Sequence, residues 1–510
     1  MQTLLAIDAG TTSLKAGLFN AQGECLGIAR FEYALETPKV DWAQVDPEIY
    51  WQACKQAVGE LLAIEGVHKQ DIAAVAVSSQ GETVMALDKN GNPLYPAIVW
   101  LDNRAGEEAR YLAELFENDV YERSGIPEVI PTWSACKVLW LRRHEPEIFA
   151  NSAKFVLVQD FLISRLCGRY VTDGSISCTS MFLDIHSHTW RNEVLDVVGV
   201  REEQLPDIVH AGSIVGSVTE NAAKELGLSE KTLVVNGGMD QSVGAIGSGN
   251  IRPGTISEST GAALAIQATV DGAVITKTNN IPIYIHSVPN KYLLLPVCPT
   301  AGMAFKWMRD QFCQREMNAA NKSGADAYDM MTNLAATIPA GAEGLVMLPH
   351  LSGAFSPNIN PLARGSFTGF TLSHRREHFI RAVMEGVAFL LKQNIDSISQ
   401  AGIQMQEIVA TGGGARSRLW NQIKADVCGL PVATMKNEET GLVGDAILAG
   451  AASGIFSSIE DGCEHMVAIR QRVYPGENQM VYQSAYARYK SLDEQLSSYF
   501  KEHYLNLQES

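Results

Sequence analysis

The stretch LLAIDAGTTSLKAGLF, residues 4 to 19, begins as a buried β-strand and breaks on a polar turn before a second apolar run. The first run ends on Asp8, and the turn that follows contains Gly10, Thr11, Thr12 and Ser13. Glycine allows a tight turn, and the hydroxyl and backbone N–H groups of the other three residues suit phosphate oxygens. Asp8 can hold a hydrated Mg²⁺, and Lys15 can reach the same phosphate as a point charge. The alternative is a plain capped turn between two strands, for which the same residue types are typical.

The length, charge and cysteine pattern of the chain limit the classes of protein to which it can belong. Its 510 residues exceed what one hydrophobic core usually serves, so we expect two large domains. A formal charge of −17 argues against general nucleic-acid binding, which needs clustered Lys and Arg. The nine cysteines include no C-x-x-C pair, which argues against a disulfide framework or a zinc ribbon and favours a reducing cytoplasm. No apolar run reaches the ~18 residues of a membrane span, so no membrane partner is expected.

The order of strand and helix signals predicts an α/β protein with two similar halves. Three short apolar segments predict an antiparallel meander at residues 3–7, 15–19 and 25–33. Near Asn250 a new strand-turn-strand begins, and a strand, a glycine turn and a helix follow later, at residues 407–429. This pattern is a weak hint of internal duplication. We therefore predict two domains, residues 1–249 and 250–510.

Two further turns can serve a nucleotide. STGAA, residues 259–263, places Thr260 and Gly261 in a second hydroxyl-glycine turn between strands, and two such turns suit a phosphate chain held between two domains. GGGARS, residues 412–417, follows a strand and precedes a helix. Ser417 stands where the dinucleotide fingerprint requires glycine, and the chain contains no P-loop motif. Close backbone approach to a flat ligand such as adenine and a simple strand-to-helix turn both stay open.

Polar groups at other strand ends indicate an acceptor site. NGGMDQ places Asp240 just after a glycine-rich strand end, where a carboxylate can take the proton of an attacking hydroxyl group. The alternative for Asp240 is an N-cap of the following helix. Gln80 and Glu82 end an earlier strand, and Trp100 follows them shortly. Polar groups beside tryptophan suit the hydroxyls and the C–H face of a carbohydrate or polyol, and an ordinary polar loop with a core tryptophan is the alternative.

Taken in order, nine motifs resemble those of the FGGY family of carbohydrate kinases. They are DAGTTSLK, SQGETV, PAIVWLDNR, CKVLWL, GGMDQ, STGAA, GMAFKW, GSFTGF with HFIRAVMEG, and TGGGARSRLWNQIKAD. The match runs from about residue 4 to residue 455. The resemblance implies two actin-like (RNase H-like) ATPase domains with an active-site cleft between them. It also implies transfer of the γ-phosphoryl group of ATP, bound with Mg²⁺, to a hydroxyl group of a small sugar, such as a ketose, or of a polyol.

The resemblance also implies roles for individual residues. Asp8 is similar to the Mg²⁺-linked carboxylate, and Asp240 is similar to the general base. The residues similar to the nucleotide-binding set are Gly10, Thr11, Thr12, Ser13, Lys15, Thr260, Gly261, Gly302, Lys306, Gly413, Gly414 and Ser417. Those of the acceptor-binding set are Gln80, Gly81, Glu82, Trp100, Asp240 and Gln241. Glycerol kinases carry Arg at the position of Gly81, so the glycine removes a cation, leaves room for a longer substrate and argues against glycerol.

Two functions from different classes fit these motifs. The leading hypothesis is an ATP-dependent kinase, in which Asp240 takes a proton from a substrate hydroxyl while the two phosphate turns and Lys15 hold the phosphates. The alternative is an actin-like ATP-binding protein that works by changing conformation. The polar pair Gln80 and Glu82 favours the kinase, because a switch protein needs no acceptor site. The expected partner is a small sugar or polyol, and a homodimer is left open.

Overall fold

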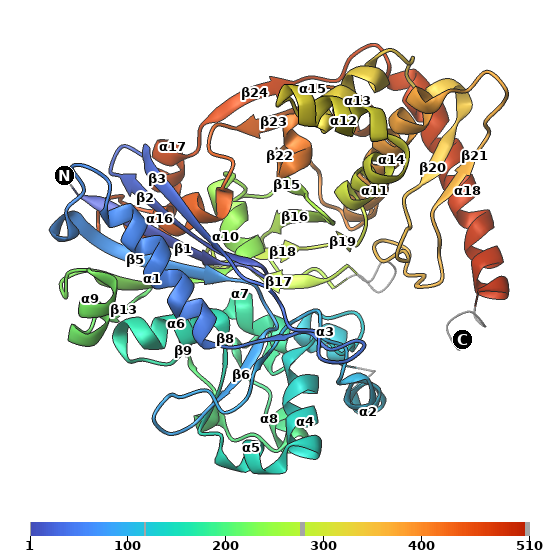
Figure 1. The fold of residues 1–510 in the computed structure, drawn as a ribbon. Helices are drawn as coiled ribbons and strands as arrows, with labels where there is room; N and C mark the ends of the chain where they lie inside the picture. Colours follow the sequence, from blue (N-terminus) through green and yellow to red (C-terminus); the bar gives the residue numbers. More distant parts are fainter. Residues whose placement is uncertain (1, 117–118, 276–280, 505–510) are drawn as a thin grey trace.

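The computed structural model describes residues 2–116, 119–275 and 281–504 of the chain. Two large mixed sheets, one from each half of the chain, form its framework, and helices pack against both (Figure 1). The predicted α/β class is therefore confirmed. Within the described residues, no helix combines the length and the apolar character needed to cross a membrane.

The first sheet contains the predicted meander. Its strands lie in the order β13 (Ile214–Ser217), β14 (Leu233–Met239), β5 (Ile72–Ser79), β1 (Thr3–Ala9), β2 (Ser13–Asn20) and β3 (Cys25–Glu32). The first three strands of the chain pair antiparallel, whereas β5 runs parallel to both β1 and β14. Ala9 and Met239 both lie opposite Ser79. The carboxyl ends of β1, β5 and β14 therefore meet at one edge of the sheet.

The second sheet repeats part of this arrangement. Its strands lie in the order β17 (Ile283–Ile285), β18 (Tyr292–Leu294), β16 (Leu264–Val270), β15 (Thr255–Thr260), β22 (Glu407–Thr411), β23 (Val432–Met435) and β24 (Ile469–Val473), and β19 (Val297–Cys298) pairs with β16. The hairpin of β15 and β16 is antiparallel, and β22 runs parallel to β15 as β5 does to β1. This shared pattern supports the hint of duplication. The domain boundary near Asn250 stays a prediction.

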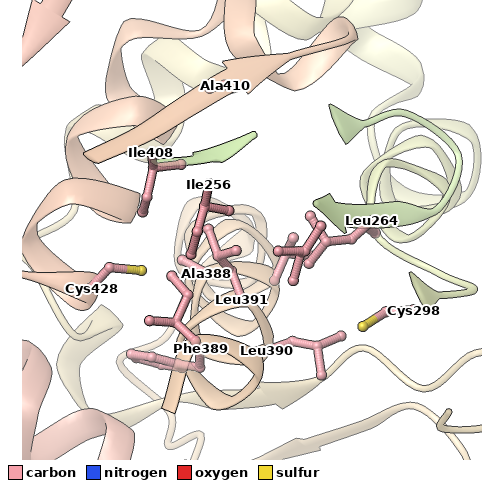
Figure 2. Close-up of a cluster of buried hydrophobic side chains, with 14 of the residues drawn as sticks. Ile256, Leu264, Cys298, Ala388, Phe389, Leu390, Leu391, Ile408, Ala410 and Cys428 are labelled. Carbon is pink, nitrogen blue, oxygen red and sulfur yellow. The ribbon is translucent and has the colours of Figure 1, made fainter. Parts of the chain in front are cut away.

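Helices surround the two sheets. In the first half they are α1 (Glu48–Leu62), α2 (Gly106–Phe116), α3 (Val120–Ser124), α4 (Ser134–His144), α5 (Pro146–Asn151), α6 (Val158–Cys167), α7 (Gly174–Ser177), α8 (Asn192–Val198), α9 (Glu220–Leu226) and α10 (Asp240–Gly247). In the second half they are α11 (Gly302–Phe312), α12 (Gln314–Ser323), α13 (Ala327–Ala336), α14 (Arg376–Gln400), α15 (Arg418–Cys428), α16 (Thr440–Ala452), α17 (Ile459–Met466) and α18 (Gln479–His503). Helix α14 lies in the core of this half, where Phe389 and Leu391 join Ile256 of β15 and Ile408 of β22 in one buried cluster (Figure 2). Each large apolar side chain buried in this way contributes about 1.5–3 kcal/mol to folding.

Helix α16 comes from the second half of the chain but packs on the first sheet. Leu442 and Ala446 share a buried cluster with Leu4 of β1. The helix also crosses α10 very closely, because a Cβ atom on Gly444 would lie only 2.0 Å from the carbonyl oxygen of Val243. This packing brings the start of α16 to the polar edge of the first sheet.

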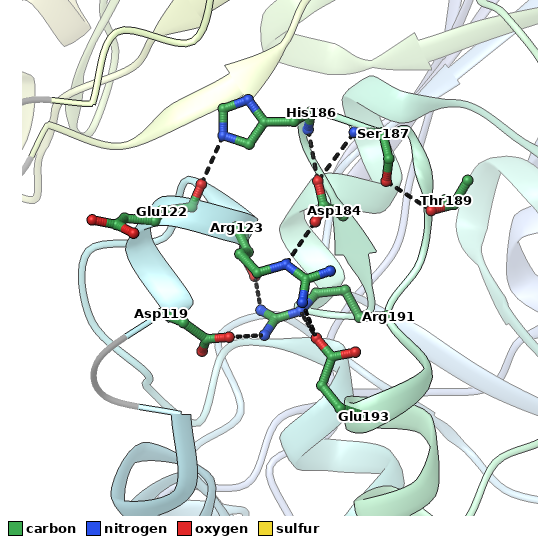
Figure 3. Close-up of polar contacts among 10 residues, drawn as sticks. Asp119, Glu122, Arg123, Asp184, His186, Ser187, Thr189, Arg191 and Glu193 are labelled. Carbon is green, nitrogen blue, oxygen red and sulfur yellow. Dashed lines mark hydrogen bonds and ion pairs between the residues drawn. The ribbon is translucent and has the colours of Figure 1, made fainter.

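A smaller sheet and several helices extend the first half. The strands of this sheet lie in the order β4 (Gln44–Val45), β7 (Ala97–Ile98), β6 (Val84–Leu87) and β8 (Lys154–Leu157). Beside it, the fully buried Arg191 donates hydrogen bonds to Asp119 at 3.0 Å and Glu193 at 2.9 Å (Figure 3). These ion pairs fix α3, and the carbonyl of Gly125 after α3 accepts a hydrogen bond at 3.0 Å from the backbone N–H of Ile283. The extension is thereby docked on strand β17 of the second sheet.

Candidate active site

The three strand ends that meet at the edge of the first sheet carry the candidate metal ligand, an acceptor-binding residue and the candidate base. Asp8 lies near the end of β1, Gln80 directly follows β5, and Asp240 directly follows β14. The structure thus brings together three residues that are far apart in the sequence. The N-cap alternative for Asp240 is wrong, because α10 begins at Asp240 itself and Met239 occupies the cap position.

Asp240 lies in negatively charged surroundings. Desolvation raises the pKa of its carboxyl to about 8, and the charges of Asp8 and Glu82 act in the same direction. The backbone N–H of Gln241 donates to Asp240 Oδ1 at 2.6 Å and opposes this shift. A carboxyl group whose pKa lies near the working pH can both take up and release a proton, which is the requirement for a general base.

Asp8 has a carboxylate oxygen that is left without a hydrogen bond by the described residues. Its Oδ1 atom is buried and accepts no hydrogen bond from any described residue. Desolvation raises the pKa of Asp8 to about 6, and the Lys15 ammonium acts against this shift. Its other oxygen faces the start of α16, where an ideal Cβ on Gly441 would lie 3.2 Å from Oδ2. Because burying an unpaired acceptor is costly, this oxygen is suited to accept a ligand such as a hydrated cation.

A magnesium ion would fit the free oxygen of Asp8. Among the described residues, no group of three or more His, Cys, Asp or Glu side chains could hold a metal ion. Mg²⁺ seldom needs such a cage, since at phosphate-transfer sites it keeps several waters and binds one or two carboxylates together with phosphate oxygens. The donor chemistry at Asp8 is of this open kind.

Asp445 on α16 is a buried carboxyl group that the sequence analysis missed. Its Oδ2 atom accepts a hydrogen bond from Ser78 Oγ at 2.6 Å, while Oδ1 has no partner among the described residues. Burial, together with the charge of Asp8, raises the pKa of Asp445 well above its usual range. The only signal available in the sequence was an aspartate within the small-residue run GLVGDAILAG.

The first phosphate turn is ordered and partly open. The N–H of Gly10 donates to the carbonyl of Ser13 at 3.0 Å, and Thr12 is exposed. The indole N–H of Trp100 donates to Thr11 Oγ1 at 2.8 Å. Trp100 was expected in the acceptor set, but its N–H group supports the phosphate turn instead. A contact between its ring and an acceptor stays a prediction.

Lys15 lies beside the phosphate turn but is not a free cation. It stands opposite Asp8 in the register of β1 and β2, and its ammonium forms an ion pair with Glu439, the residue before α16. A phosphate would have to compete with this carboxylate. The pairing joins residues 424 positions apart in sequence, so no local pattern predicts it.

The acceptor loop contains a strained residue and a buried lysine. Gln80 Nε2 donates to the Tyr50 hydroxyl at 2.9 Å, and Gln80 Oε1 is buried with no partner among the described residues. Glu82 has a φ of 58°, a left-handed conformation that is uncommon for residues other than glycine. Lys137 of α4, fully buried, donates to the Glu82 carbonyl at 3.1 Å. Desolvation raises the pKa of the Glu82 carboxyl, and the Lys137 ammonium acts against this shift. The sequence signal for Lys137 was a lysine inside the apolar run CKVLWL.

Two acceptor residues are placed differently from what was expected. Gly81 was expected to leave room, but an ideal Cβ there would lie 3.1 Å from Thr179 Oγ1 and 3.6 Å from Met239 Sδ. Thr179 therefore fills the space that a side chain at position 81 would take. Gln241 Oε1 accepts a hydrogen bond at 2.6 Å from Gln267 Nε2 of β16, so this side chain is bonded to the second sheet.

The predicted nucleotide glycines pack against one another. A Cβ on Gly302 would lie 2.1 Å from the carbonyl oxygen of Gly261, and a Cβ on Gly414 would lie 2.6 Å from Cβ of Thr260. The second phosphate turn therefore touches both the start of α11 and the glycine turn before α15. The structure brings these three segments together, as the resemblance implied, and their contact with a nucleotide stays a prediction.

Two other residues of the predicted nucleotide set are bonded within their own helices. Lys306 pairs with Asp310 one turn later at 2.5 Å, with half of its side chain exposed. Ser417 is the N-cap of α15 and accepts a hydrogen bond from the Trp420 N–H at 3.1 Å. An ion pair between residues four apart and a side-chain N-cap are both common interactions within a single helix.

Replacing Gly302 by alanine is expected to disturb the nucleotide end of the site. The added methyl group would overlap the Gly261 carbonyl, an overpacking cost of about 1–3 kcal/mol, so the melting temperature should fall by about 2–8 °C. The KM for ATP should rise as well. The matched control is Gly106→Ala, which also changes the first residue of a helix but meets no atom within 4 Å. Equal effects of the two variants on the KM for ATP would contradict this account of Gly302.

Models of a known protein family match both halves of the chain. The N-terminal domain of the FGGY family of carbohydrate kinases matches residues 3–247, and the C-terminal domain of the same family matches residues 266–453. The chain belongs to the FGGY family of carbohydrate kinases. The FGGY kinase is accordingly a phosphotransferase with an alcohol group as acceptor, and it has the two-domain actin-like fold of the family.

Individual relatives agree with this assignment. Xylulose kinase from Bacillus subtilis (strain 168) is 29% identical over 493 residues, which cover 96% of this chain and 97% of that protein. Gluconokinase from the same strain is 30% identical over 480 residues, which cover 93% and 92%. The solved structure of xylulose kinase from Rhodospirillum rubrum has a TM-score of 0.88 and 28% identity, and it covers 98% of this FGGY kinase and 100% of that chain.

Proposed function

We propose that this FGGY kinase transfers the γ-phosphoryl group of Mg²⁺-ATP to a hydroxyl group of a small neutral sugar or polyol, with Asp240 as the general base. The observation that carries the proposal is the position of Asp240. Its carboxyl heads α10 at the sheet edge where β1 also ends, and its pKa responds both to Asp8, beside the first phosphate turn, and to Glu82, in the acceptor loop. A base placed between a phosphate site and a hydroxyl site is what phosphoryl transfer to an alcohol needs.

Each of these groups has its own role in the proposed transfer. Asp240 takes the proton of the acceptor hydroxyl as its oxygen attacks the phosphorus atom. The first phosphate turn would offer the backbone N–H groups of Thr11 and Thr12 and the exposed Thr12 hydroxyl to phosphate oxygens, because the N–H of Gly10 already donates to Ser13. Asp8 would hold the Mg²⁺, which neutralises phosphate charge when bound. Mutual closure of the two halves would exclude water from the reaction.

The charge of the site favours a neutral acceptor. Near the acceptor loop lie the carboxyl groups of Glu82 and Asp240, while the nearby cations Lys15 and Lys137 already bond to Glu439 and to the Glu82 carbonyl. An acid such as gluconate would bring a carboxylate for which neither of these two lysines is free, and like charges in a desolvated site repel strongly. A ketose such as a pentulose, or a polyol, carries no such charge.

An acceptor panel tests this proposal. We expect ADP formation to be stimulated by a neutral ketose such as xylulose or by a polyol, and to be stimulated little by gluconate. The measurement is ADP release with and without each compound at saturating ATP. Strong stimulation by gluconate would refute the neutral acceptor, whereas ATP turnover that no sugar or polyol stimulates would favour the conformational switch protein.

The pH dependence of kcat/KM should follow the protonation of Asp240, which belongs to a carboxyl cluster with Asp8 and Glu82. Activity is expected to rise with pH as Asp240 loses its proton, with a midpoint no higher than about 8, because bound Mg²⁺ offsets the charge of Asp8. Glu82→Gln removes one of the charges that raise this pKa, so the midpoint should move to lower pH. The control is Glu108→Gln, a buried glutamate on α2 outside the cluster. A midpoint that stays in place or moves to higher pH in Glu82→Gln would argue against Asp240 as the titrating base.

A further inference from the structure

A closed ring of hydrogen bonds lies directly behind the second phosphate turn. Lys424 Nζ of α15 donates to Glu258 Oε1 at 2.6 Å and to Thr260 Oγ1 at 2.9 Å, and the Thr260 hydroxyl donates to Glu258 Oε2 at 2.7 Å. The side chains of Glu258 and Lys424 are both 0% exposed. Each of the three side chains therefore bonds to the other two.

The ring determines what the Thr260 hydroxyl can do. A hydroxyl group has one hydrogen to donate, and here that hydrogen is used on Glu258. While the ring is closed, Thr260 cannot donate its hydroxyl hydrogen to a phosphate, in contrast to what the hydroxyl-rich turn predicted. The N–H of Gly261 already donates to the carbonyl of Ala263 at 3.0 Å. The phosphate contacts of this turn must then come from the backbone N–H of another exposed residue, such as Ala262.

Stability is a weak explanation for a fully buried ion pair. Removing two charges from water costs several kcal/mol per ion, and apolar replacements of similar volume are often as stable or more so. Such a pair is better explained by the geometry that it fixes. Here it fixes Thr260 at the tip of β15, where the chain turns toward the predicted phosphate site.

The ring also reaches the glycine turn that precedes α15. A Cβ on Gly414 would lie 2.6 Å from Thr260 Cβ, and the Thr411 hydroxyl donates to the Glu258 carbonyl at 3.0 Å. Lys424 itself comes from the helix that follows this turn. One set of bonds thus joins β15, the end of β22 and α15.

We propose that Glu258 and Lys424 are positioning residues that hold the Thr260–Gly261 turn and the Gly412–Gly414 turn as one nucleotide-binding platform. The inference rests on the proposed function in taking ATP as the ligand. It adds that the two turns move together and that their spacing, and hence ATP affinity, depends on two residues that never touch the nucleotide.

The decisive variant removes both charges and keeps the volume: Glu258→Gln with Lys424→Met. We expect the dissociation constant for ATP, measured by isothermal titration calorimetry, to rise about tenfold or more, while the KM for the acceptor changes by less than about twofold. In hydrogen exchange, segments 259–263 and 411–416 should gain exchange together. An unchanged dissociation constant, or gain in only one of the segments, would overturn the proposal.

A second buried ion pair supplies the matched control. Arg381 Nε of α14 donates to Glu385 Oε1 at 2.7 Å, and the other hydrogen bonds of Arg381 run to Tyr482 and to carbonyls near the end of α13. The variant Arg381→Met with Glu385→Gln removes the same kind of buried ion pair but should leave the ATP dissociation constant within about twofold. Equal loss of ATP affinity in both double variants would show a general stability effect and overturn the positioning role.

Lys424→Met alone keeps the proposal testable if the double variant does not fold. The Thr260 hydroxyl can still donate to Glu258, so one of the three hydrogen bonds of the ring is kept and the two made by Lys424 are lost. ATP binding should weaken about threefold or more, and unchanged binding would overturn the proposal. A wild-type protein that does not bind ATP would instead refute the proposed function itself.

Discussion

Asp240→Asn should lower kcat by about 10²- to 10⁴-fold, the usual contribution of a positioned general base, while the dissociation constant for ATP changes by less than about twofold. The amide has nearly the shape of the carboxylate but cannot accept the proton of the attacking hydroxyl. The loss should therefore appear in kcat and not in nucleotide binding. Single-turnover phosphoryl transfer and nucleotide titration measure the two quantities separately.

The control for this variant is Asp184→Asn. Asp184 accepts hydrogen bonds from Arg123 and from two backbone N–H groups in the ion-pair network of the extension (Figure 3). Its replacement should reduce stability without lowering kcat by more than about twofold. If Asp240→Asn kept more than about a tenth of the wild-type kcat, Asp240 would be excluded as the base.

The second large effect is expected for Asp8→Asn, which should raise the Mg²⁺ concentration that the enzyme needs. The proposed Mg²⁺ contact is the carboxylate oxygen that accepts no hydrogen bond from the part of the chain that the structure describes, and an amide oxygen is a weaker ligand for a hard cation. We expect the Mg²⁺ concentration for half-maximal activity to rise about tenfold or more, together with a lower kcat. A titration with Mg²⁺ at saturating ATP measures both.

Asp445→Asn separates metal binding from a general effect of removing a buried carboxyl. Asp445 bonds to Ser78 and is charge-coupled to Asp8, but it is not a proposed ligand. Its replacement should leave the Mg²⁺ requirement within about twofold of wild type. An Asp8→Asn enzyme with the wild-type requirement for Mg²⁺ would mean that the metal is held elsewhere.

The framework of the site was readable from local sequence patterns. Apolar segments bounded by turn residues predicted the meander and the hairpin of β15 and β16, and the polar residues at the strand ends marked the edge where Asp8 and Asp240 meet. A strand end can be recognised from neighbouring residues alone, and parallel strands place their carboxyl ends at the same edge of a sheet. These predictions therefore needed no knowledge of distant contacts.

What the sequence could not provide is the partner of each side chain. Lys15 bonds to Glu439, Thr260 to Lys424 and Gln241 to Gln267, and each pairing depends on how separate segments pack. Helix α16 crosses α10 closely and thereby brings Asp445 to the site. The glycines that allow this crossing do not indicate that Asp445 bonds to Ser78. Residue type alone therefore identified the candidate groups but not which of them are free to meet a ligand.

The most direct test of the central claim follows the γ-phosphorus of ATP by ³¹P NMR in the presence of Mg²⁺ and a neutral sugar or polyol that stimulates turnover. We predict a new phosphomonoester signal that appears as the ATP signals fall, that requires the acceptor, and that is absent with Asp240→Asn. Release of inorganic phosphate alone, at the same rate with and without any sugar or polyol, would contradict phosphoryl transfer to an acceptor hydroxyl at this site.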